Sequence, residues 1–165
     1  MDATHYLNSS LREKILEHLF VGDVLKKLWL KDIRDMEVLK AEVDNGGYDV
    51  VVSCNNVIRY IQLKGSKTDS KTSKQNINLL LSKKPSGCVI WMFCDPVSLD
   101  LGPFYWFGGL PGEPLPDISE FKTAIHTKSN AEGVKGERPN IRVIKKSQFE
   151  KLGTIDEVID KLFGV

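Results

Sequence analysis

Two neighbouring β-type runs carry polar side chains whose types and spacing suit metal-assisted phosphodiester hydrolysis. The first run opens with Asp49, and the second closes with Gln62 and Lys64. In a strand, the side chains of residues i and i+2 share one face, so Gln62 and Lys64 point the same way. Asn55 and Asn56 mark the turn between the runs, and a hairpin there brings Asp49 up to that face. A carboxylate, an amide and an ammonium group are therefore expected to converge on one sheet surface.

Each of these side chains has a task in such chemistry. Mg²⁺ or Mn²⁺ binds oxygen ligands, which Asp49 and Gln62 can supply, although Gln62 lacks the negative charge of a carboxylate. Lys64 is suited to orient or deprotonate the attacking water and to stabilise charge on the phosphate. The alternatives are a turn role for Asp49 after two glycines, a solvent-facing position for Gln62 and an exposed strand end for Lys64.

The first expected helix offers a further carboxylate. Glu17 lies on the same helical stripe as Val24 and Leu28. A carboxylate on such a face is partly buried and needs a partner, which is either a metal ion or a basic residue. Glu42, on the strand expected before the hairpin, is the rival ligand, and Glu13 is interpreted as a capping residue only.

The order and types of these residues resemble the PD-(D/E)xK nuclease superfamily, whose fold is called restriction-endonuclease-like. In that superfamily a strand-borne Asp and an acidic-x-Lys motif on the next strand follow a helix that often contributes a Glu. The matching positions here are Asp49, Gln62-Leu63-Lys64 and Glu17. Gln62 stands where most members have Glu or Asp, and some branches carry Gln there. The whole chain also resembles a family of small, mostly uncharacterised bacterial proteins.

The resemblance implies a metal-dependent endonuclease that cleaves DNA with Mg²⁺ or Mn²⁺. Asp49, Glu17 and Gln62 would hold the metal, and Lys64 would complete the catalytic set. Many enzymes of this fold act as dimers, so a homodimer is expected by analogy. The alternative function, motivated by Gln62, is a catalytically degraded module that binds nucleic acid or a protein without cutting. A third interpretation is a defence or toxin component whose protein partner supplies specificity.

Two zones of positive charge fit a nucleic-acid partner, with DNA favoured over RNA. The net charge is only +1, but residues 64–84 hold six lysines against one acid, and residues 122–146 hold seven Lys or Arg against two acids. Phosphate contacts supply most sequence-independent affinity for nucleic acid. The alternative is an ordinary solvated surface. The residues predicted to contact nucleic acid are Ser66, Lys67, Lys71, Lys74, Gln75, His126, Lys128 and Arg138.

Length and composition predict one domain spanning residues 1–165. Apolar residues make up 41% of the chain and charged residues 27%, as in ordinary globular proteins. No apolar run approaches the roughly 20 residues that span a bilayer, and the N-terminus lacks a signal-peptide layout, so a cytoplasmic location is expected. The three cysteines lack metal-binding spacing and are expected to be reduced and buried.

The pattern of elements predicts an α/β fold, with a mixed sheet flanked by helices in the order α-β-β-β-α-β plus C-terminal additions. That order is also the one of the restriction-endonuclease-like fold. The aromatic residues around 91–93 and 104–107 are interpreted as core rather than as base-stacking surfaces. The expected elements are a helix from Ser10 to about Leu30, a strand over 37–43, the hairpin, a helix over 72–82, a fully buried strand over 88–94, a strand over 104–107, a short helix from Asp117, an extended or mobile loop over 127–140, a strand over 141–144 and a helix capped by Thr154 that ends near Phe163.

Overall fold

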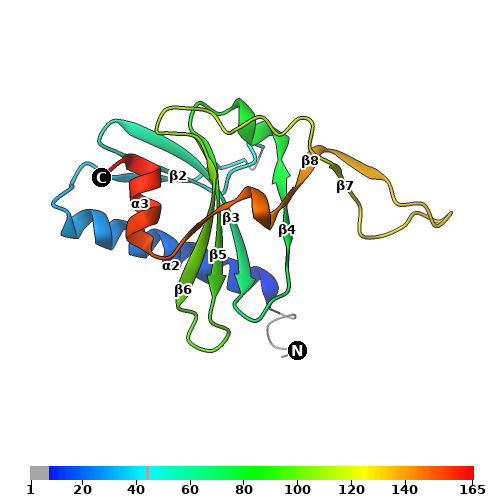
Figure 1. Cartoon of the computed structure of the whole chain (residues 1–165), viewed down its shortest axis with the longest axis horizontal. Coiled ribbons are helices and arrows are strands. Elements are labelled where there is room, and N and C mark those ends of the chain that lie inside the picture. The colour runs from blue at the N-terminus through cyan, green and yellow to red at the C-terminus, as the bar shows by residue number, and fades with distance from the viewer. Residues whose placement is uncertain (1–7, 44) are drawn as a thin grey trace.

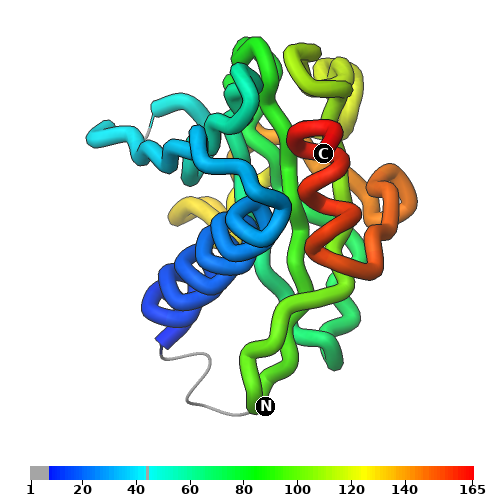
Figure 2. The backbone as a smooth tube through the Cα atoms, turned by 90° about the vertical axis from the view of Figure 1, so that its left-hand side faces the viewer, coloured from blue at the N-terminus to red at the C-terminus, as the bar shows by residue number. Residues whose placement is uncertain are grey.

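A six-stranded mixed sheet carries two α-helices on one face and a three-stranded sheet on the other (Figures 1 and 2). The computed structural model describes residues 8–43 and 45–165. The expectation about a signal peptide concerns residues outside these ranges. In Figure 1, α3 lies at the left and α2 runs across the lower part of the view, while the small sheet lies to the right of the large one. The mixed α/β architecture expected from the sequence is confirmed.

The large sheet has the spatial order β1-β2-β3-β5-β6-β9, and its neighbours are antiparallel except for the parallel pair β3 and β5. The small sheet is antiparallel throughout, in the order β4-β8-β7. The bounds are Glu37–Leu39 (β1), Val50–Cys54 (β2), Val57–Lys67 (β3), Lys74–Asn78 (β4), Gly87–Cys94 (β5), Leu101–Gly108 (β6), Thr123–Ile125 (β7), Glu137–Lys145 (β8) and Glu150–Leu152 (β9).

Strand β5 is the centre of the molecule, and all eight of its residues are buried. Its continuous apolar sequence is explained by layers that cover both faces of the sheet, which leave no solvent-facing side for polar residues. The buried strand expected over 88–94 is confirmed. Cys54, Cys88 and Cys94 are free and buried, which confirms the prediction for the cysteines.

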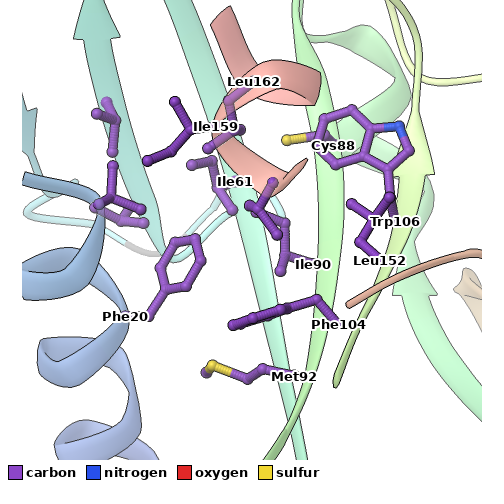
Figure 3. Packing of buried hydrophobic residues seen from close by; sticks show 14 of the residues in the cluster. Phe20, Ile61, Cys88, Ile90, Met92, Phe104, Trp106, Leu152, Ile159 and Leu162 are labelled. Atoms are coloured by element: carbon purple, nitrogen blue, oxygen red, sulfur yellow. The ribbon is translucent and has the colours of Figure 1, made fainter. Parts of the chain in front are cut away.

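Helices α2 (Ser9–Leu30) and α3 (Ile155–Phe163) build the core on one face of the large sheet. Phe20 of α2 and Ile159 and Leu162 of α3 pack there against Ile61 and the inward side chains of β5 and β6 (Figure 3). Thr154 accepts a hydrogen bond from the Glu157 backbone in a capping box, which confirms the expected start of α3. Within the described ranges, no helix combines the length and apolarity needed to cross a membrane.

The small sheet packs on the opposite face through a second core cluster. Ile77 of β4 and Ile144 of β8 are fully buried there against Trp91 of β5 and other aromatic side chains. This cluster, together with the burial of Phe104 and Trp106, confirms that the aromatic runs are core.

The prediction of a helix over 72–82 is wrong, because this segment forms β4 followed by a 3₁₀ helix over Leu79–Lys83. Pairing of β4 with the distant strand β8 explains the difference, since a strand partner far along the chain overrides a local helical spacing. The connection from β3 to β5 therefore runs through a strand and a short 3₁₀ turn where the predicted order has an α-helix.

Four smaller expectations also change. The strand expected over 37–43 ends at Leu39, and Ser10 lies inside α2, which starts at Ser9 after Asn8 without a side-chain cap. No helix forms at Asp117, which instead accepts a hydrogen bond from the backbone of Ser119 in a turn. The loop expected to continue to residue 140 gives way to β8 at Glu137, so the late strand is longer than predicted.

Candidate active site

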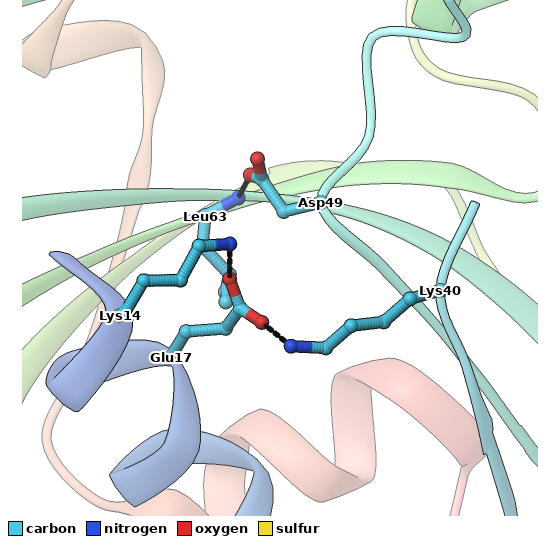
Figure 4. Close-up of polar contacts among 5 residues, drawn as sticks. All are labelled: Lys14, Glu17, Lys40, Asp49 and Leu63. Atoms are coloured by element: carbon cyan, nitrogen blue, oxygen red, sulfur yellow. Dashed lines mark hydrogen bonds and ion pairs between the residues drawn. The ribbon is translucent and has the colours of Figure 1, made fainter. Parts of the chain in front are cut away.

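The candidate site lies where strand β2 leaves strand β3. The two strands pair only as far as Val50 and Ile61, while β3 continues to Lys67 beside β5. Asp49 lies at the branch point, where its N–H donates to the Ile61 carbonyl at 2.8 Å and its Oδ2 accepts from the Leu63 N–H at 2.6 Å (Figure 4). The carboxylate therefore replaces the missing strand partner and is held beside Gln62 and Lys64.

A polar cleft of about 680 Å³ opens at this point between the two sheets. Its first wall carries Asp49, Gln62 and Lys64, so the structure brings together the three residues that the hairpin pattern singled out. Its second wall is formed by residues 71–76 and 78, which include most of β4, and by Arg138 and Ile141 of β8. We call this space the inter-sheet cleft.

Lys64 is electrostatically unusual in this setting. Removal from water lowers the pKa of its ammonium group below the ordinary value, and the positive charge of Arg138 acts in the same direction. The negative charges of Asp49 and Glu13 oppose the shift without cancelling it. A lowered pKa increases the share of the lysine that is neutral at a given pH. Since only the neutral amine can accept a proton, the shift favours a role for Lys64 as a base toward water.

Gln62 provides the test of whether the residues present fit a divalent cation. Its Oε1 atom is buried and has no hydrogen-bond partner in the described part of the chain. A buried amide oxygen without a partner is energetically unfavourable and is rare in folded proteins. Mg²⁺ is commonly held by one or two carboxylates together with waters and substrate phosphate. Asp49 and Gln62 on one wall fit that type of site.

Glu17 is held by lysines. It is 6% exposed, its Oε2 accepts from Lys14 Nζ at 3.0 Å, and its Oε1 accepts from Lys40 Nζ (Figure 4). Burial alone raises the pKa of Glu17, but the hydrogen bonds and charges of Lys40 and Lys14 outweigh it and leave the pKa below its usual value. Of the two partners expected for this carboxylate, the structure shows the basic residues.

A second, smaller pocket of about 360 Å³ lies between α2 and β3. Glu13, Glu17, Asp49 and Lys64 all line it, so Asp49 and Lys64 border both spaces. Glu13 is exposed, and its charge acts on Lys64, a role that its interpretation as a capping residue missed. Its position one helical turn before Glu17 was the available signal. Glu42, the rival ligand, is exposed on the β1–β2 connection and lines neither pocket.

The predicted nucleic-acid contacts divide into three groups. Lys71, Lys74, Gln75 and Arg138 line the inter-sheet cleft, although Gln75 lies on strand β4 and does not open a helix. Ser66 is buried, and its hydroxyl accepts a 2.9 Å hydrogen bond from the indole N–H of a core tryptophan. Its side chain is therefore directed into the core and not toward a nucleic acid.

The remaining three predicted contacts lie outside the cleft. Lys67 is half-buried at the end of β3 and is absent from the cleft lining. His126 and Lys128 are exposed beyond β7, in the connection to β8 that projects from the body (Figure 1). At the inter-sheet cleft the two basic zones meet through Lys64, Lys71, Lys74 and Arg138.

Two contributions to the site were not found from the sequence. Lys40 pairs with Glu17 across 23 residues of the chain. Gly47 has φ of +74°, and a Cβ there would lie 2.8 Å from Cβ of Asn78. The sequence indicates only a turn at Gly46 and Gly47, whereas in the structure Gly47 also packs the segment before Asp49 against the end of β4.

Comparisons with known proteins add little to this picture. No family model matches the chain, and no curated protein does either. A similar solved structure is that of Hjc, a Holliday junction resolvase from the archaeal hyperthermophile Archaeoglobus fulgidus, with a TM-score of 0.45 and 14% sequence identity. The alignment covers 86% of this chain and 98% of that one.

Among the described residues, no group of three or more His, Cys, Asp or Glu side chains is arranged to hold a metal ion.

Proposed function

We propose that this chain is a metal-dependent nuclease of the restriction-endonuclease-like class that hydrolyses phosphodiester bonds in DNA. The observation that carries the proposal is geometric: Asp49, Gln62 and Lys64 line one wall of the inter-sheet cleft and so place a carboxylate, an amide and an amine side by side. Lysines and an arginine of the opposite wall complete a surface for phosphate groups.

The residues of the cleft would divide the work as follows. Asp49 and the Oε1 atom of Gln62 would hold Mg²⁺ or Mn²⁺, which when bound supplies Lewis-acid polarisation of the scissile phosphate. Lys64 in its neutral form accepts a proton from the attacking water. The cationic form that results then lies beside the negative charge that develops on the phosphate. Arg138 and Lys74 bind flanking phosphates and fix the position of the strand.

Glu17 has a different task in this proposal. Both of its carboxylate oxygens accept hydrogen bonds from lysine side chains. We assign it to the support of the helix and of the segment that carries Lys40, while Glu13 adjusts the protonation of Lys64 from the other side. The helix would thus act on the site through charge and packing.

A second candidate function is an inert module of the same fold that grips nucleic acid or a protein without cutting. The observation that favours it is that the side chain of Gln62 is neutral. Among the described residues that line the inter-sheet cleft, Asp49 alone is acidic. Divalent ions bind more weakly as the number of charged ligands falls. Titration of the protein with Mn²⁺ separates the two functions, since the inert module shows no binding that depends on Asp49.

The deciding experiment is cleavage of plasmid DNA, single-stranded DNA and RNA by the purified protein with Mg²⁺ or Mn²⁺. We expect cleavage of DNA that stops with EDTA and in Lys64→Ala but persists in Lys67→Ala. Lys67 is the matched control, because it lies on the same strand and does not line the cleft. Cleavage that survives in Lys64→Ala would refute the assignment of the site. Salt-sensitive binding without any cleavage would favour the inert module.

A further inference from the structure

The shape of the inter-sheet cleft restricts which nucleic acids can reach Lys64. The two sheets pack face to face through Ile77 and Ile144, which are fully buried, and separate beyond them. Gln75 shares a face of the small sheet with these isoleucines, because it lies directly opposite Ile144 and two residues before Ile77. Gln75 lines the cleft from one side and Lys64 from the other, so a bound group at Lys64 is contacted from both sheets.

The volume of the cleft matches a small ligand. Pockets of 300–1,000 Å³ enclose ligands of drug size, and at about 680 Å³ the cleft falls within this range. One nucleotide is a ligand of that size. A duplex, whose major groove alone is about 12 Å wide, presents its backbone on the outside of a much thicker body. The wall formed by residues 71–76 and 78 faces Lys64 across the cleft, so a group bound at Lys64 lies between two protein surfaces.

The lining is also suited to an unpaired base. Thr72, Ser73 and Gln75 supply hydroxyl and amide groups, which can donate to and accept from base edges that are occupied by pairing in a duplex. Tyr48 borders the same cleft, but its ring is already engaged, because it packs edge-to-face against Tyr60 with the Lys84 ammonium over it. The polar groups therefore carry the contact with the base.

From this geometry we propose that the cleft takes an unpaired nucleotide, so that the substrate is single-stranded nucleic acid or an unpaired position within a duplex. This inference deepens the proposed function and rests on it for the reaction, although the binding preference stands independently of cleavage. The phosphate of the bound nucleotide lies at Lys64, and its base lies toward Thr72, Ser73 and Gln75.

The test measures binding and cleavage separately. Three fluorescein-labelled DNAs of one sequence serve as probes: a single strand, a fully paired duplex and a duplex with a short central gap. Anisotropy in EDTA gives affinity without cleavage. We expect the single strand to bind roughly tenfold more tightly than the duplex, because hydrogen bonds to unpaired base edges add to the phosphate contacts. Preference for the gapped duplex over the single strand would identify unpaired positions in a duplex as the source of the nucleotide.

Two variants connect the preference to the cleft. Gln75→Leu keeps the size of the side chain but removes the amide that faces Lys64 across the cleft, and it should weaken single-strand binding severalfold while leaving duplex binding unchanged. Arg138→Gln should reduce the salt dependence of binding by about one phosphate contact. Lys145→Gln is its control, because Lys145 is exposed on the same strand and does not line the cleft.

The outcomes separate the two proposals. Equal or tighter binding of the paired duplex, or cleavage of duplex and single strand at the same rate, overturns the inference and leaves the nuclease standing. Selective binding of the single strand without cleavage by any metal supports the inference and refutes the nuclease. Absence of binding to all three probes refutes both.

Discussion

The carboxylate of Asp49 and the backbone N–H of Leu63 are joined by a 2.6 Å hydrogen bond at the point where β2 leaves β3. Leu63 lies between Gln62 and Lys64, so this bond ties the proposed acidic ligand to the strand that carries the other two groups. The separation of the strands also opens the edge of β3 on that side. One contact thus positions a side chain and makes room for a substrate.

Two substitutions distinguish the contribution of Asp49 to stability from its proposed contribution to cleavage. Asp49→Asn keeps an oxygen that can accept from Leu63, so we expect near wild-type stability and no cleavage. Asp49→Ala leaves the Leu63 N–H without this acceptor and should lower the free energy of unfolding by about 1 kcal/mol in addition to abolishing cleavage. Urea denaturation and a plasmid assay measure the two effects. Full activity in Asp49→Asn would remove the carboxylate from the mechanism.

Lys64 is expected to reduce stability in exchange for reactivity. Folding lowers the pKa of Lys64 below its ordinary value of 10.5. Between the folded pKa and the ordinary pKa the unfolded chain binds more protons than the folded chain, so the free energy of unfolding rises with pH across that range. Lys64→Met should therefore have a free energy of unfolding about 1 kcal/mol higher than that of wild type at pH 7, and it should not cleave DNA. Thermal denaturation at pH 7 and near pH 10 checks this, since the gain should shrink at the higher pH. A destabilised Lys64→Met would contradict it.

Gln62 distinguishes a ligand from a strand residue. Its buried Oε1 lacks a partner among the described residues, so Gln62→Met should unfold no more readily than wild type and should bind Mn²⁺ more weakly. Gln62→Glu restores a carboxylate and should bind Mn²⁺ roughly tenfold more tightly, because affinity rises with ligand charge. Isothermal titration calorimetry measures both. Identical Mn²⁺ affinity in the three proteins would exclude Gln62 as a ligand.

Glu17 is expected to matter for folding more than for catalysis. Glu17→Gln removes the charge that holds two lysines and should lower the free energy of unfolding at neutral pH by about 1–3 kcal/mol. The pKa of Glu17 is lowered on folding, so this contribution is complete above its ordinary value of 4.5 and is lost as pH falls through the folded value. Denaturation at pH 7 and pH 3 should show the variant and wild type converging at acid pH.

Glu13→Gln is the matched control for that experiment, because Glu13 is exposed one turn earlier on the same helix. It should leave stability nearly unchanged and shift the pH dependence of cleavage to lower pH, since its negative charge raises the pKa of Lys64. If Glu17→Gln abolished cleavage without loss of stability, Glu17 would be a member of the reactive site.

Gly47 is expected to set the position of Asp49. Gly47→Ala introduces a Cβ in the left-handed region, at φ of +74°, and within 2.8 Å of Asn78. Gly112→Ala is a control for the backbone effect alone, because its φ is +84° and no atom lies within 4 Å of the new Cβ. The left-handed backbone should lower the free energy of unfolding of both variants by about 1 kcal/mol. The contact with Asn78 should lower it further in Gly47→Ala, and this variant should also cleave DNA more slowly. Equal losses and equal activity would show that the contact with Asn78 does not position the site.

Local spacing in the sequence was enough to predict part of this site. Asp49, Gln62 and Lys64 belong to one hairpin, in which alternation and a short turn determine which side chains meet. The buried strand β5 and the capped helix α3 could be predicted for the same reason, because both depend on residues that are neighbours in the chain.

Only the tertiary structure decided the other wall of the cleft and the partners of the helix. Residues 74–78 form a strand because β8 pairs with them, and no local spacing records a partner so far along the chain. The same holds for Arg138 at the cleft, for Lys40 on Glu17 and for the tryptophan that draws Ser66 into the core. The sequence determined the chemical groups on one strand pair, while long-range packing determined the space around them, because contacts between distant segments depend on the whole fold.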